Sequence, residues 1–143
     1  MAIRQISIFV DNKPGILGKV TQFLADNNID LRALSIADAA DFGVVRFITS
    51  DVERAQEILN KEEYLSKVNH VLAVSVDDTP GGLSKLATLL GENGINIEYL
   101  YAFVLPSKTK ACVVLRVESN KRAEEVLLAN NVHLLSEEEI LGA

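Results

Sequence analysis

Two stretches of the sequence decide the fold: Val10-Asp11-Asn12-Lys13-Pro14-Gly15-Ile16-Leu17 and Val76-Asp77-Asp78-Thr79-Pro80-Gly81-Gly82-Leu83. The second lies 66 residues after the first, and ten of the 28 positions from Ser7 to Leu34 are identical at this offset. After a two-residue insertion the offset becomes 68 for the rest of the chain. Self-similarity at a fixed spacing is typical of a duplicated structural unit. We therefore expect two copies of one unit, over residues 1–69 and 70–143.

Each copy is expected to fold into the same elements. In the first copy, near-alternating β-branched residues predict a strand over 3–10, which Pro14-Gly15 ends. Apolar residues at helical spacing then predict a helix, with the proline in its first turn, where the missing N–H leaves no donor unpaired. The remaining expected elements are strands over 31–37 and 42–49, a helix opened by a capping box of Ser50 and Glu53, and a short strand near 64–68.

The element order βαββαβ is the split-βαβ, or ferredoxin-like, plan. Right-handed crossovers place both helices of such a unit on one face of its sheet. The predicted fold class is therefore α+β, with two ferredoxin-like βαββαβ units whose antiparallel sheets carry helices on one face. The join at residues 68–72 is partly apolar and holds no Gly/Ser-rich linker.

Composition argues against several classes of protein. Apolar residues make up 48% and charged residues 24% of the 143 residues, which is typical of a folded protein. The formal charge of −6 disfavours binding to nucleic acid, which needs clusters of cations. No apolar run reaches the roughly 20 residues of a membrane span, and the first residues do not resemble a signal peptide. With Cys112 as the single cysteine, we expect a cytoplasmic protein without disulfide, metal or cofactor.

Two further function classes find little support in the residues. The segment 41–47 partly matches the third-strand motif of RNA-recognition domains. However, Ala40 stands in place of the phosphate-binding cation, Asp41 in place of a glycine, and Val44 in place of a stacking ring. No nucleophile lies beside a histidine motif, and no glycine-rich phosphate loop occurs, so we expect no enzymatic activity. An RNA-binding module stays open as an alternative from another class.

The two quoted stretches, together with Asn28-Ile29-Asp30-Leu31 and Gly94-Ile95-Asn96-Ile97, resemble the ACT domain, a regulatory module of amino-acid-pathway enzymes. The resemblance covers essentially the whole chain, twice. It implies that a free amino acid binds at the interface between two units, where the loop after the first strand of one faces the start of the second strand of its neighbour. The residues that it implies for ligand binding are Asp11, Asn12, Pro14, Gly15, Ile16, Leu17, Asp30, Asp77, Asp78, Pro80, Gly81, Gly82, Leu83 and Asn96.

The chemistry of the turn fits such a ligand. Unpaired N–H groups at a helix N-terminus attract an α-carboxylate, and glycine lets the ligand approach the backbone closely. Asp or Asn oxygens can accept from the α-ammonium. The polar pair is inverted between the copies, because Asn12 goes with Asp30 and Asp78 goes with Asn96. In the alternative interpretation, Pro-Gly only makes a tight turn and Asn12 caps the helix.

The resemblance therefore implies a non-catalytic sensor that binds a free amino acid and regulates amino-acid metabolism, as a homodimer and with a metabolic enzyme as possible partner. Two alternatives stay open. One is a regulatory small subunit of a biosynthetic enzyme, similar to that of acetolactate synthase; the other is a purely structural or dimerising ACT protein. Gly82 replaces Ile16, from which we expect the second pocket to admit a bulkier ligand side chain.

Overall fold

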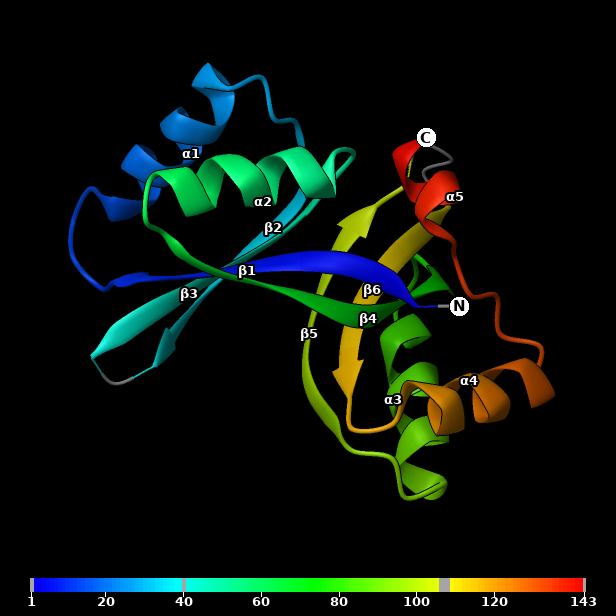
Figure 1. Cartoon of the computed structure of the whole chain (residues 1–143). Helices are drawn as coiled ribbons and strands as arrows, with labels where there is room; N and C mark the ends of the chain where they lie inside the picture. Colours follow the sequence, from blue (N-terminus) through cyan, green and yellow to red (C-terminus); the bar gives the residue numbers. More distant parts are fainter. Residues whose placement is uncertain (1, 40, 106–108, 143) are drawn as a thin grey trace. The chain divides into compact units, whose positions relative to one another are not determined.

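The computed structural model describes residues 2–39, 41–105 and 109–142 (Figure 1). The chain divides into two compact units, residues 4–69 and residues 70–143, the second of which also includes the first three residues. Below they are called the N-terminal unit and the C-terminal unit.

The N-terminal unit has the order βαββαβ, and its strands lie in the order β2-β3-β1-β4. β3 pairs antiparallel with both neighbours, so that Val45 lies across from Ile8 on one side and from Ile36 on the other. The elements are β1 (Ile3–Asp11), α1 (Ile16–Asp26), β2 (Leu31–Ala39), β3 (Phe42–Thr49), α2 (Val52–Lys61) and the first residues of β4 (Leu65–Asp77).

The C-terminal unit repeats this plan. Its strands lie in the order β4-β6-β5, and a bridge between Val74 and Leu134 adds the last strand position on the side of β4 that faces away from β6. β4 thus provides the closing strand of the first unit and the opening strand of the second. The further elements are α3 (Gly82–Glu92), β5 (Ile97–Val104), β6 (Lys110–Val117), α4 (Asn120–Ala129) and α5 (Glu137–Leu141). The prediction of two ferredoxin-like units is confirmed.

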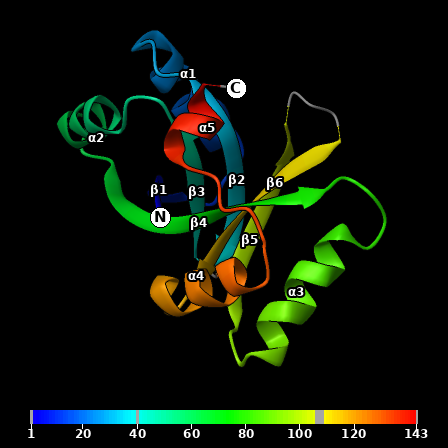
Figure 2. The ribbon, with the colours of Figure 1, turned by 90° about the vertical axis from the view of Figure 1, so that its right-hand side faces the viewer.

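Each unit has its own hydrophobic core between its sheet and its two repeated helices. Figure 2 shows the ribbon of these helices and strands from a second side. Equivalent positions fill the two cores: Leu24 of α1 and Leu90 of α3 are both fully buried, as are Leu59 of α2 and Leu127 of α4. Because the helices of each unit contribute to one core, they cover one face of its sheet, as the crossover rule requires.

Three helix starts differ from the prediction. Pro14 precedes the N-cap of α1, which is Gly15, instead of lying in the first helical turn. α2 is capped by Asp51, whose side chain accepts from the N–H of Arg54, so the predicted Ser50–Glu53 capping box is wrong. The third is the start of α5, a helix that the sequence analysis does not predict, which opens with a capping box between Ser136 and Glu139.

No helix in the described part of the chain combines the length and the hydropathy that a membrane crossing requires.

Candidate functional site

The turns that precede α1 and α3 have nearly the same geometry. Gly15 (φ +89°, ψ −12°) and Gly81 (φ +92°, ψ −8°) are the N-cap residues, and neither helix has a side chain that caps it. The N–H of Lys19 donates to Gly15 and that of Lys85 to Gly81, each at 3.0 Å. The first N–H of each helix, that of Ile16 or Gly82, donates to the carbonyl oxygen of Lys13 or Thr79, and no side chain caps the N–H groups that follow at the positive dipole end.

The interpretation of Asn12 as the cap of α1 is wrong. The amide nitrogen of Asn12 donates instead to the Asp38 carboxylate, at 2.8 Å. Asp30 lies just before β2, and its carboxylate pairs with the guanidinium of Arg32 at 3.4 Å. No contact between Asn12 and Asp30 occurs among the described residues. Their pairing across two units, which the resemblance implies, stays a prediction.

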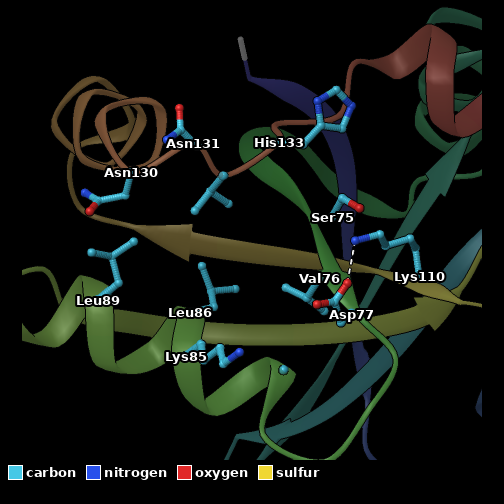
Figure 3. A pocket seen from close by; sticks show the side chains of 12 residues that line it. Ser75, Val76, Asp77, Lys85, Leu86, Leu89, Lys110, Asn130, Asn131 and His133 are labelled. Carbon is cyan, nitrogen blue, oxygen red and sulfur yellow. Dashed lines mark hydrogen bonds and ion pairs between the residues drawn. The ribbon is translucent and has the colours of Figure 1, made fainter.

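A pocket lies beside each turn, within a single unit. The pocket of the N-terminal unit, about 480 Å³, is lined by Phe9, Val10, Asp11, Ile16, Phe42, Glu63, Tyr64 and Leu65. The pocket of the C-terminal unit, about 550 Å³, is lined by Ser75, Val76, Asp77, Gly82, Lys85, Leu86, Leu89, Lys110, Asn130, Asn131, Val132 and His133 (Figure 3). They are called the N-terminal pocket and the C-terminal pocket below.

Few of the residues expected at the site line these pockets. Asp11 and Ile16 line the N-terminal pocket, and Asp77 and Gly82 line the C-terminal pocket. Asn96 lines a smaller hollow of about 190 Å³ together with Glu98 and Glu118. The other expected residues line none of the three: Asn12, Pro14, Gly15, Leu17, Asp30, Asp78, Pro80, Gly81 and Leu83.

The backbone packing around residue 82 requires a glycine at this position. A β-carbon at this position would lie 2.2 Å from the carbonyl oxygen of Asp77, far inside any normal contact. The close approach of these two backbone segments requires glycine here, independently of any ligand. Whether the missing side chain also admits a bulkier ligand stays a prediction.

Sequence reasoning missed the cations of the C-terminal pocket. Lys110, at the start of β6, donates a hydrogen bond to the Asp77 carboxylate (Figure 3). This bond, with the charge of Lys110, lowers the pKa of Asp77, and the charge of Lys85 lowers that pKa further. His133 bonds the Glu139 carboxylate at 2.8 Å, which lowers the pKa of Glu139. The available signal was the 68-residue offset, which places Lys110 over Phe42.

The described residues contain no group of three or more His, Cys, Asp or Glu side chains that could hold a metal ion. Cys112 lies in β6 with no exposed surface, and burial raises the pKa of its thiol to about 12. A protonated, buried thiol is a poor nucleophile.

Comparisons with known proteins identify the family. The model of the ACT domain pair matches residues 1–142. Protein BT0572 from Bacteroides thetaiotaomicron is 37% identical over 100% of this chain and 98% of that chain, with a TM-score of 0.90. The regulatory subunit of aspartate kinase from Thermus thermophilus, in its ligand-free form, is 20% identical over 88% and 91% of the two chains, with a TM-score of 0.60. That likeness is one of fold.

A search of curated proteins finds no match. The family match spans both copies of the duplicated unit, each with the turn that suggested the resemblance. The chain belongs to the ACT domain pair family.

Proposed function

We propose that the chain is a non-catalytic regulatory protein of amino-acid metabolism, which binds a free amino acid at the turns before α1 and α3. The observation that carries this proposal is the pair of uncapped helix N-termini behind Gly15 and Gly81. An α-carboxylate would supply an acceptor for the N–H groups after the first one of each helix, which no side chain caps.

The polar residues that the resemblance brings together across two units suit the other end of the ligand. In each copy, one aspartate and one asparagine supply oxygen acceptors for an α-ammonium group: Asn12 with Asp30, and Asp78 with Asn96. Hydrogen bonds to charged groups contribute about 1.5–3 kcal/mol each. Because ordering and desolvation costs oppose them, we expect binding in roughly the micromolar to millimolar range.

The proposal includes a second copy of the chain. Asn12 and Asp30 do not meet within the N-terminal unit, so a neighbouring unit must bring one partner to the other. A homodimer in the cytoplasm, acting on a metabolic enzyme, is the assembly we propose. Ligand binding would then bias the packing of two units and pass the signal to that enzyme.

Calorimetric titration with each of the twenty amino acids tests the proposal. We compare the wild type with the double variant Gly15→Ala/Gly81→Ala, which places methyl groups at the two turns. The control is Gly91→Ala, which adds a methyl group near the C-terminal end of α3, away from the turn, where no atom lies within 4 Å. Binding that is lost in the first variant and kept in the control supports the site. Equal heats in both variants, or no heat for any amino acid, contradict it.

A purely dimerising role is the second candidate, and the exposed apolar residues of β2 and β5 favour it. Leu34 and Ile36 on β2 are 36% and 48% exposed, and Leu100 and Val104 on β5 are 36% and 62% exposed. Exposed apolar residues on a strand commonly mark an interaction surface. Sedimentation of Ile36→Lys tests this role. A monomeric variant, together with a wild type that binds no amino acid, supports a dimerising role over sensing.

A further inference from the structure

The C-terminal pocket lies where the end of β4, the first half of α3, the start of β6 and the turn after α4 meet (Figure 3). All of its lining residues belong to one unit, so it needs no second copy to form. Its volume of about 550 Å³ falls within the range of small-molecule pockets. It lies beside the turn: Asp77 and Gly82 line it, whereas Asp78 and Gly81 do not.

The N-terminal pocket is its structural counterpart. Both pockets end at an aspartate across from the first residue of the next strand: Asp11 across from Phe42, and Asp77 across from Lys110. Glu63 and Asn131, at the 68-residue offset, both adopt a positive φ, near +60°. The backbone around the two pockets is therefore alike, and a difference between them reflects the side chains.

The side chains of the two pockets differ in polarity and charge at equivalent positions. In the N-terminal pocket, the rings of Phe9 and Phe42 pack at 6.0 Å between centroids. The C-terminal pocket has Ser75 and Lys110 at the same two places. An aromatic pair has thus been exchanged for a hydroxyl group and a cation. The residue pairs at this and the other changed lining positions are Phe9/Ser75, Ile16/Gly82, Phe42/Lys110, Glu63/Asn131, Tyr64/Val132 and Leu65/His133.

The charges of the C-terminal pocket favour an anion. Lys85 and Lys110 both line it, whereas Asp77 is the one carboxylate among its lining residues. Asp77 is already bonded by Lys110. Leaving His133 aside, the lining side chains therefore hold one positive charge in excess, and they offer an incoming ammonium group no carboxylate that is not already paired. A carboxylate placed near Lys85 would meet a favourable field.

Apolar side chains line much of the rest of the C-terminal pocket. Leu86 is 3% exposed, and Val76, Leu89 and Val132 are half-buried. In Figure 3, the side chains of Leu86 and Leu89 project from α3 into the pocket, and the Asp77–Lys110 pair lies at another part of its rim. Contact with these side chains would bury a short hydrocarbon chain.

We propose that the C-terminal pocket binds a small aliphatic carboxylate that lacks an ammonium group, with its carboxylate beside Lys85 and Lys110 and its hydrocarbon part on Leu86, Leu89 and Val132. This ligand class differs from the zwitterion of the proposed function. The chain would respond to two kinds of metabolite, an amino acid at the turns and an organic acid in this pocket.

The test uses three probes of similar shape on the full chain: 3-methyl-2-oxobutanoate, valine and isobutyramide. The first has a carboxylate without an ammonium, the second has both charges, and the third has neither. Calorimetry at low ionic strength is expected to give the tightest binding for the oxo acid. Two-dimensional NMR is expected to show its largest amide shifts at Leu86, Leu89 and Val132. Isobutyramide that binds as tightly as the oxo acid, or shifts confined to the N-terminal unit, overturn the proposal.

Variants identify the groups that hold the anion. Lys85→Met is expected to weaken oxo-acid binding at least tenfold, and Lys110→Phe, which restores the residue of the N-terminal pocket, is expected to weaken it similarly. The matched control is Lys19→Met, since Lys19 holds on α1 the place that Lys85 holds on α3. It should bind like the wild type. Unchanged affinity in both pocket variants, with thermal unfolding showing all three folded, overturns the proposal.

The two proposals fail separately. If the oxo acid binds and Lys85→Met weakens its binding, while no amino acid gives a heat of binding, the proposed function is contradicted and the proposal for this pocket is supported. If an amino acid binds and Gly15→Ala/Gly81→Ala abolishes its binding, while the oxo acid does not bind, the proposed function is supported and the proposal for this pocket is contradicted.

Discussion

Lys110 lies directly across from Asp77 in the β4–β6 pair and donates a hydrogen bond to its carboxylate, whereas the same register in the N-terminal unit places Phe42 across from Asp11. One cross-strand position thus carries an ion pair in one copy and an aromatic side chain in the other. The two pockets differ in charge because of positions such as this one.

Lys110→Phe is expected to raise the pKa of Asp77 back toward its ordinary value of 3.8, because the hydrogen bond and charge of Lys110 lower it. A carboxyl group with a lowered pKa in the folded state stabilises the fold above its unfolded pKa, and this contribution is lost as the pH falls through the folded value. The variant should therefore lose less stability than the wild type below pH 3.8. NMR titration of the Asp77 carboxyl carbon measures the shift.

Glu139 is the internal reference for that titration. The hydrogen bond from His133 lowers its pKa, and Lys110 is not among the causes. The pKa of Glu139 should be the same in wild type and variant. An Asp77 pKa that does not rise in Lys110→Phe would contradict the ion pair.

Gly81→Ala is expected to destabilise the protein by about 1–2 kcal/mol, because φ of +92° is strained for a residue with a β-carbon. No atom within 4 Å would meet the added methyl group, so the cost arises from the backbone alone. Gly91→Ala, in the interior of α3, is the control and should stabilise the protein by about 0.5–1 kcal/mol. Urea unfolding measures both. Equal and small effects would argue against the left-handed turn.

Leu90→Ala is expected to destabilise the protein by about 2–5 kcal/mol, because Leu90 is fully buried in the core of the C-terminal unit and its truncation leaves a cavity. Leu128→Ala on α4 is the control, since Leu128 is 60% exposed and should change stability by no more than about 0.5 kcal/mol. Denaturant unfolding compares them. Similar losses for both leucines would contradict this core.

Cys112 is expected to resist thiol reagents in the folded protein at pH 8, because burial raises its pKa to about 12 and leaves it no exposed surface. The same protein in denaturant should react within the mixing time, which serves as the control. The raised pKa also implies that stability falls as the pH rises from the ordinary thiol value of 9.0 toward about 12, because the unfolded thiol ionises first. Rapid labelling of the native protein would show that the thiol is accessible.

Local signals in the sequence were sufficient for the fold. The duplicated Pro-Gly turn, followed each time by apolar residues at helical spacing, predicted both copies and their order of elements. The failures were also local. Both Ser50 and Asp51 are good N-cap residues, and the chain uses Asp51. The Ser136–Glu139 capping box is also a local signal, but the helix that it opens is not among the predicted elements.

The C-terminal pocket could not be predicted in the same way. Asp77, Lys85, Lys110 and His133 come from four separate segments, and only the tertiary arrangement brings them to one cavity. Helical or strand periodicity does not predict which side chains from separate segments lie close together in the fold. Aligning Lys110 with Phe42 at the 68-residue offset shows that this position differs between the two copies. The alignment does not show which side chains surround Lys110.

One strand, β4, crosses the boundary between the copies, with residues 65–69 in the first unit and 70–77 in the second. A tandem repeat is usually joined by a loop that proteases nick and that tolerates insertions. Here the joint is itself extended, ladder-forming backbone, so neither copy can be excised at residue 69 without cutting a strand. Engineers who want a single copy would have to rebuild that strand for each half.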